Sequence, residues 1–191
     1  RLAVENKRAN AGRLLAAVPG ELASAPAYIF GRAQYARRQE NWTEAANWLE
    51  KAPRDAAGMV VPDEWWEEKR IVSRKLLELG DARRAYRLIA DHQGSTRQKQ
   101  SEAEFHKGWY ALRFLRDAQR ARGHFAKIGD GSRSPVTLAR MHYWLGRADE
   151  AAGGSGNASF EKAASFGNAF YGMLARTKLG RTDFALTRPA G

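Results

Sequence analysis

The chain contains no cysteine among its 191 residues. This absence excludes disulfide bonds, thiolate metal sites and a cysteine nucleophile at once. No apolar run approaches the roughly 18 residues needed to cross a bilayer, so no membrane span is expected. Convincing period-two alternation of apolar and polar residues is also missing, which argues against β-strands. The N-terminal stretch 1–18 carries charges throughout and therefore does not resemble a secretory signal peptide.

Motifs for catalysis or metal binding are scarce as well. The four histidines, His92, His106, His124 and His142, form no i, i+4 pair, so the spacing of a helical metal site is absent. No Gly-rich phosphate loop, serine elbow or dinucleotide fingerprint occurs. The glutamates fit exposed helix positions or helix starts, rather than apolar pockets that would raise a carboxyl pKa. We therefore expect no catalytic residue, no metal site and no cofactor in this chain.

Positive charge is abundant. The chain has 32 Lys and Arg against 21 Asp and Glu, a formal net charge of +11. Such a charge favours an acidic partner, either a nucleic acid, an anionic membrane surface or an anionic cell-wall polymer. The alternative is that solvated Arg and Lys on the outer faces of helices keep the protein in solution. Nucleic acid is not expected, because the basic residues are dispersed and no recognition motif accompanies them.

Apolar residues recur at three- and four-residue steps along most of the chain, which predicts helices. The clearest case is 104–128, where Phe105, Trp109 and Leu112 mark one helix and Phe125 marks a second. Between them Asp117 is a plausible N-cap, so the two helices should form an antiparallel hairpin. The other expected helices cover residues 1–18, 26–39, 45–49, 62–79, 81–92, 135–148, 160–164 and 169–179, with a loop over 53–61.

The corners between helices recur along the chain. Asn41, Asp81 and Asp117 are each followed four residues later by an alanine, at intervals of 40 and 36 residues. A helix pair repeated at this period is typical of tetratricopeptide-like solenoids. We predict an all-α fold, an α-superhelix built as an irregular solenoid of helical hairpins over 1–180. Residues 181–191 are interpreted as a tail or the start of a linker to a further C-terminal domain.

Aromatic and arginine residues that share a helix face are candidate ligand contacts. Trp66 with Arg70, and Tyr143 or Trp144 with Arg147, are spaced by three or four residues. Trp stacks on sugar rings and Arg binds carboxylates, which suits a groove for an acidic glycan. The alternative is packing between helices, with Arg covering the rim. The candidate glycan or partner contacts are Trp66, Arg70, Arg113, Arg116, Arg120, Tyr143, Trp144, Arg147 and Tyr171.

The chain contains, in this order, Asp63-Glu64-Trp65-Trp66, Leu76 to Asp81, Gly108 to Leu115, Tyr143 to Ala148, and Phe170-Tyr171-Gly172. Taken together, these stretches resemble the superhelical (U/L-type) domain of soluble lytic murein transglycosylases, the Slt type of Gram-negative bacteria. The resemblance runs from about residue 28 to residue 180. In this family a ring- or horseshoe-shaped α-superhelix is followed by a lysozyme-like domain, whose catalytic Glu lies in a Glu-Ser motif. That motif is absent here.

The resemblance implies a periplasmic, non-catalytic segment of a peptidoglycan lytic transglycosylase. Such a segment would scaffold the catalytic domain and hold or guide peptidoglycan strands during cell-wall remodelling. Its partners would be anionic peptidoglycan and its own catalytic domain, which cleaves the MurNAc–GlcNAc bond to an anhydro product. The alternative is a tetratricopeptide-like adaptor that binds a protein segment, because both uses require a concave surface with aromatic and basic residues.

Overall fold

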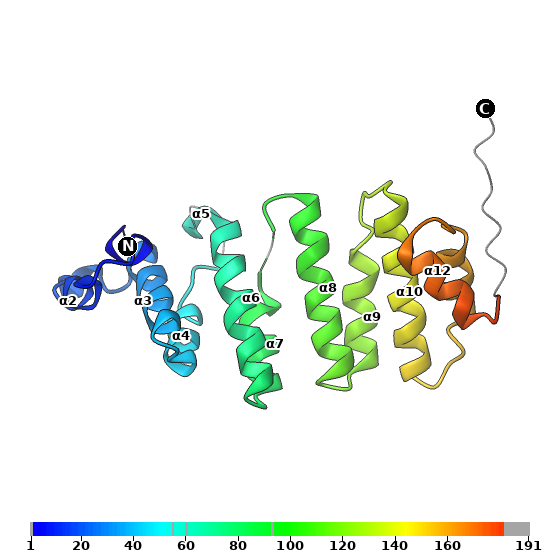
Figure 1. Ribbon diagram of the computed structural model, residues 1–191, viewed down its shortest axis with the longest axis horizontal. Helices are drawn as coiled ribbons and strands as arrows, with labels where there is room; N and C mark the ends of the chain where they lie inside the picture. The colour runs from blue at the N-terminus through cyan, green and yellow to red at the C-terminus, as the bar shows by residue number, and fades with distance from the viewer. Residues whose placement is uncertain (1, 55, 60, 93, 182–191) are drawn as a thin grey trace. The chain divides into compact units, whose positions relative to one another are not determined.

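The computed structural model describes residues 2–54, 56–59, 61–92 and 94–181 (Figure 1). All regular structure in these ranges is helical and none of it is strand, which confirms the all-α class. The chain divides into two compact units, Arg1–Leu115 and Arg116–Gly191. Each unit is built from packed helix pairs and is described by itself. The predicted tail, apart from Arg181, lies outside the described residues.

Unit 1 begins with short helices and continues with longer ones that pack in pairs. Within it α3 packs against α4, α6 against α7, and α7 against α8, while α4 and α6 join neighbouring pairs. Its core includes completely buried residues on several helices, among them Ala33, Trp66, Val72 and Tyr110. The helices are α1 (Leu2–Glu5), α2 (Ala11–Ala16), α3 (Pro26–Arg38), α4 (Trp42–Leu49), α5 (Ala56–Met59), α6 (Pro62–Glu78), α7 (Ala82–Ala90) and α8 (Arg97–Arg113), with a 3₁₀ turn at Gly20–Leu22.

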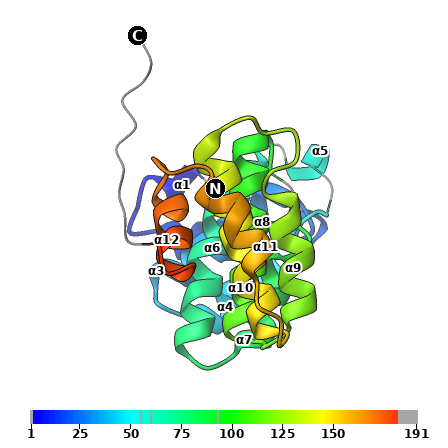
Figure 2. The ribbon, with the colours of Figure 1, turned by 90° about the vertical axis from the view of Figure 1, so that its right-hand side faces the viewer.

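Unit 2 is organised around one long helix. This helix, α10 (Pro135–Ala151), packs against α9 (Ala118–Lys127), α11 (Asn157–Ala164) and α12 (Phe170–Lys178) (Figure 2). Gly146 lets α10 and α11 approach closely, because a Cβ at this position would lie 2.6 Å from a carbon of the Phe160 ring. The missing side chain is thus a packing requirement at this crossing.

Three corners, at 40–41, 80–81 and 116–117, share one local pattern. The first residue of each corner has a positive φ. The second is Asn or Asp, and its side chain accepts a hydrogen bond from the backbone N–H three residues later, at 2.9 to 3.2 Å. These contacts confirm the predicted caps and their spacing. The alanine four residues after each cap is fully buried, as expected for a close helix approach: Ala45, Ala85 and Ala121.

The first predicted helix and the predicted loop over 53–61 are both wrong. Residues 1–18 form α1 and α2 rather than one helix, because the chain turns between them and Lys7 takes a φ of 52°. A left-handed residue cannot continue a right-handed α-helix. The predicted loop contains the short helix α5, which ends at Met59; the carbonyl of Met59 accepts a hydrogen bond from Trp65 Nε1 at 3.0 Å.

The apolar stripe predicted for α8 differs from the face that is buried. Trp109 is only partly buried, whereas Tyr110 and Ala111 on the neighbouring positions are completely buried. Leu79, the last residue of the helix predicted over 62–79, is 59% exposed, because α6 has already ended at Glu78. The boundary between the two units falls at the corner of the predicted 104–128 hairpin, so its two helices, α8 and α9, belong to different units.

Candidate functional site

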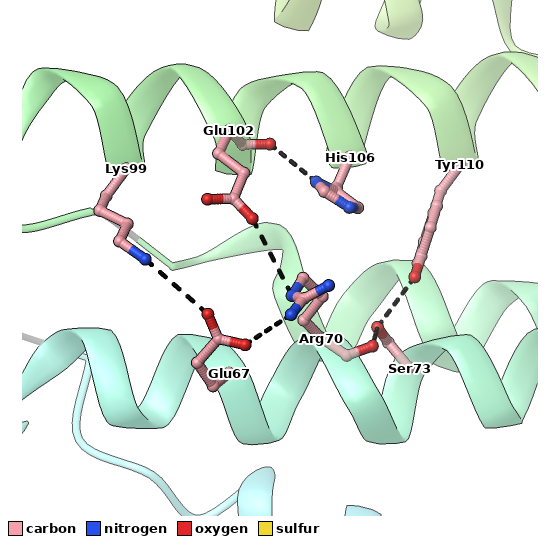
Figure 3. A network of polar contacts seen from close by, with 7 residues as sticks. All are labelled: Glu67, Arg70, Ser73, Lys99, Glu102, His106 and Tyr110. Atoms are coloured by element: carbon pink, nitrogen blue, oxygen red, sulfur yellow. Dashed lines mark hydrogen bonds and ion pairs between the residues drawn. The ribbon is translucent and has the colours of Figure 1, made fainter.

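Arg70, a predicted contact, lies in a polar network that joins α6 to α8 (Figure 3). Its Nη2 donates a hydrogen bond to Glu67 at 2.6 Å, and its Nε lies 3.9 Å from Glu102. Lys99 Nζ lies 3.8 Å from the other carboxylate oxygen of Glu67. The hydrogen bond that Arg70 donates to Glu67 raises the pKa of Arg70. The guanidinium is therefore held by two carboxylates of its own chain, which leaves less of its charge for a ligand.

The same interface contains a hydroxyl pair between the two helices. Ser73 Oγ and Tyr110 Oη lie 3.0 Å apart, and Ser73 Oγ also donates to the Arg70 carbonyl at 3.1 Å (Figure 3). Burial raises the pKa of Tyr110. Both side chains are completely buried, so this pair satisfies polar groups inside the core and offers no contact to a ligand.

Trp66, another predicted contact, has no exposed surface. Its indole stacks on the His92 imidazole, with ring centroids 4.9 Å apart, and meets His106 edge-on at 5.6 Å. A fully covered indole cannot stack on a sugar ring, so the prediction that Trp66 contacts a ligand is wrong. The physical reason is that α6 is covered on several sides, by α3, α4 and α7 and through its network with α8.

Two lysines and a histidine are buried beside Trp66. Lys69, Lys107 and His92 are 6%, 4% and 1% exposed. Lys107 Nζ donates to the His92 carbonyl at 2.7 Å and to Glu104 at 2.8 Å. Burial lowers the pKa of Lys69, and burial together with the two lysine charges lowers the pKa of His92 to about 4.

His92 is therefore neutral at pH 7, and neither ring nitrogen has a hydrogen-bond partner among the described residues. A neutral imidazole next to a lysine of lowered pKa has the chemical character of an acid–base pair. Both ring nitrogens are buried, however, so a substrate cannot reach them in this conformation. The cluster serves as a core contact around the Trp66–His92 stack.

A buried ion pair connects α3 to α6. Arg37 donates to both oxygens of Glu68, at 2.6 and 2.9 Å, and Gln34 donates to the same carboxylate at 3.1 Å. The bidentate geometry fixes how the two helices pack. Sequence periodicity gave no indication of this contact, because its partners lie 31 and 34 residues apart.

In unit 2 the structure brings Tyr143, Trp144, Arg147 and Tyr171 into one cluster. The Tyr143 ring lies 5.4 Å from Tyr171 and 5.8 Å from Trp144, centroid to centroid. Arg147 Nη1 donates to Tyr143 Oη at 3.3 Å, and its Nε lies 3.1 Å from Glu150. Tyr143 is buried, whereas Trp144, Arg147 and Tyr171 remain partly exposed. The cluster packs α10 against α12 and leaves three of its four side chains partly exposed.

The three remaining predicted contacts are exposed arginines. Arg113 ends α8 in unit 1, and Arg116 and Arg120 lie at the start of α9 in unit 2. Arg120 forms an ion pair with Asp117 at 3.1 Å, and its side chain is 50% exposed. Arg113 and Arg116 form no ion pair with a described residue. Of the predicted contacts, these arginines are the most accessible to a partner.

Trp48 is an aromatic contact that the sequence patterns did not indicate as a candidate. Lys51 Nζ and the Arg32 guanidinium lie over its ring, 4.2 and 4.8 Å from the centroid. Tyr28 meets it edge-on at 5.6 Å, and Trp48 Nε1 donates to Glu44 at 2.6 Å. The spacing of Glu44, Trp48 and Lys51 could have indicated part of this cluster. Because two cations already lie over the indole of Trp48, we do not propose that its ring stacks on a ligand.

Within the described ranges, no group of three or more His, Asp and Glu side chains could hold a metal ion. None of the helices described is both long and apolar enough to cross a bilayer. Comparison of the chain with protein-family models, with curated proteins and with solved structures gives no match.

Proposed function

We propose that this chain is a non-catalytic α-helical segment of a peptidoglycan lytic transglycosylase in the periplasm. It scaffolds the catalytic domain and holds peptidoglycan strands through exposed cations. One observation supports the binding role: exposed cations remain without an ion pair to any described residue. Four of them lie between residues 113 and 133: Arg113, Arg116, Lys127 and Arg133.

The charge distribution favours an anionic polymer over a small ligand. Lys107 and Arg70 are held by contacts within the chain, whereas the cations without an ion pair to a described residue lie on the surface. Peptide stems give peptidoglycan a negative charge, so many weak contacts along a strand add through multivalency. We propose peptidoglycan rather than another anionic polymer because the sequence resembles the Slt superhelical domain.

The test is co-sedimentation of the chain with purified peptidoglycan at rising salt. We expect binding at low ionic strength that is largely lost near 1 M salt, where the Debye length falls to about 3 Å. Chemical amidation of the peptidoglycan carboxyl groups should remove the same binding. No sedimentation at low salt would refute the glycan-holding role.

A matched pair of triple variants separates the effect of particular cations on binding from the effect of net charge. The first, Arg113→Gln/Arg116→Gln/Lys127→Gln, removes cations that form no ion pair with a described residue. The second removes three ion-paired cations, Arg70→Gln/Arg84→Gln/Arg122→Gln, and lowers the net charge equally. We expect the first triple to weaken binding more. Equal loss in both would mean that only overall charge attracts the polymer.

A further inference from the structure

α9 carries an exposed basic face with a glycine at its centre. Arg120, Gly123 and Lys127 are spaced by three and four residues, so they share one side of the helix. All three are exposed, whereas the opposite side buries Ala121 and Phe125. We call Arg120, Gly123 and Lys127, together with the preceding Arg116, the α9 basic face.

Gly123 has no packing role within the described structure. A Cβ at this position would meet no atom within 4 Å, in contrast to Gly146, where it would meet Phe160 at 2.6 Å. An exposed glycine inside a helix is less favourable than alanine, because its backbone loses more conformational freedom on folding. Its benefit is that a partner can approach the helix backbone closely.

Arg116 is likewise not explained by the stability of α9. Arg116 holds a φ of 54°, a left-handed conformation, at the corner position where Gly80 stands in the preceding corner. Arg116 and Arg120 flank the N-terminus of α9, and the first turn of this helix contains no acidic residue. Cations are unfavourable at this end of the helix dipole. Three independent features of one surface thus reduce local stability, a pattern that is expected where a surface serves binding.

We propose that the α9 basic face is the docking surface for a linear glycan strand that carries carboxylates, with an uncharged segment of the strand lying against Gly123. This assignment rests on the proposed function and locates it on unit 2. Arg120 and Lys127 are separated by seven residues, a rise of about 10 Å along the helix. That distance leaves room for uncharged units between two contacted carboxylates, whereas phosphates recur about every 3.4 Å along a strand of duplex nucleic acid. No aromatic side chain is exposed on α9 to stack a base.

Charge complementarity supports an anionic occupant. Between residues 116 and 133 there are five Lys and Arg but only two Asp and Glu. One of these acids, Asp117, is already paired with Arg120 and caps α9. Lys127 and Arg133 form no ion pair with any described residue.

The test compares Gly123→Ala with Gly20→Ala, using soluble peptidoglycan strands as the probe. Gly20 is also exposed and a Cβ there meets nothing within 4 Å, but it lies in the 3₁₀ turn of unit 1. We expect Gly123→Ala to raise Tm by about 1 to 4 °C, because alanine favours the helix. The same variant should weaken strand binding at least about threefold, and Lys127→Gln at least about fivefold. Gly20→Ala should bind as the unsubstituted chain does.

The outcomes separate this assignment from the proposed function. Binding by the unsubstituted chain that Gly123→Ala and Lys127→Gln leave unchanged would overturn the α9 site but keep the peptidoglycan role. No binding by the unsubstituted chain would overturn the proposed function itself. Tighter binding of a single-stranded oligonucleotide, with the same dependence on Gly123 and Lys127, would overturn the glycan as occupant. Loss of binding together with a higher Tm for Gly123→Ala would support the assignment, because unfolding could not explain it.

Discussion

The buried imidazole of His92 should lower the stability of unit 1 at acidic pH. The substitution His92→Phe should reveal this contribution. His92 is neutral in the folded chain, since burial and the charges of Lys69 and Lys107 lower its pKa to about 4 from an ordinary 6.5. The opposing charge, Asp63, raises this pKa by a smaller amount. Unfolding releases the ring to water, where it takes up a proton below pH 6.5. The folded state is therefore favoured fully above pH 6.5 and loses this contribution as pH falls toward 4.

The magnitude follows from the two pKa values. Relative to the high-pH limit, linkage lowers the free energy of unfolding by about 1.4 kcal/mol at pH 5.5 and by about 2.6 kcal/mol at pH 4.5. Solvent screening of the lysine charges reduces these figures, so we expect about 1.5 to 2.5 kcal/mol at pH 4.5. The substitution His92→Phe keeps a flat ring against Trp66 but cannot bind a proton, and it removes two ring nitrogens that lack described partners.

Urea unfolding of both chains at several pH values between 4.5 and 7.5 provides the measurement. Carboxylates elsewhere titrate in both proteins, so the difference between the two stability curves isolates His92. His92→Phe should gain relative stability steadily below pH 6.5. Lys69→Met should make the acid loss smaller, because removing this charge raises the pKa of His92. Parallel stability curves for the unsubstituted chain and His92→Phe would refute the reasoning, as would an NMR titration that places the pKa of His92 near 6.5.

Two further predictions concern local packing and capping. Gly146→Ala should destabilise unit 2 by about 1 to 3 kcal/mol in thermal unfolding, because the new Cβ would overlap the Phe160 ring; an unchanged Tm would show that the ring moves away without cost. Asp81→Ala should cost about 1 kcal/mol in urea unfolding, since it removes the hydrogen bond to the Arg84 N–H at 3.0 Å. Asp81→Asn keeps a hydrogen-bond acceptor and should lose much less stability. An equal loss of stability in both variants would exclude capping as the cause.

Contacts within a few residues explain which predictions succeeded. The all-α class, the capped corners and the buried alanines after them depend on interactions over about four residues, which the sequence displays directly. The first predicted helix failed for a local reason that is hard to see in sequence. Lys7 adopts a left-handed conformation, which residues other than glycine seldom take. The residue type at this position therefore does not indicate that the helix ends.

The candidate site was less predictable because burial is decided by distant partners. Helical spacing placed Trp66 and Arg70 on a shared face, but α6 has neighbours on several sides, and these bury Trp66 and engage Arg70. The pairs that anchor α6 join residues 31 to 37 positions apart, as in Arg37 with Glu68 and Ser73 with Tyr110. The same holds on α9, where composition indicates positive charge but only the tertiary contacts distinguish two exposed cations. Arg122 is paired with Asp149 at 2.9 Å, whereas Lys127 forms no ion pair with a described residue.

The sequence by itself determined that the chain is helical, where the corners between helices fall and that the surface is basic, because periodicity, capping and charge are properties of neighbouring residues. Only the tertiary structure decided which aromatic residues are core and which cations remain open. A helix presents several faces, and the sequence of that helix alone does not state which of them its neighbours will cover.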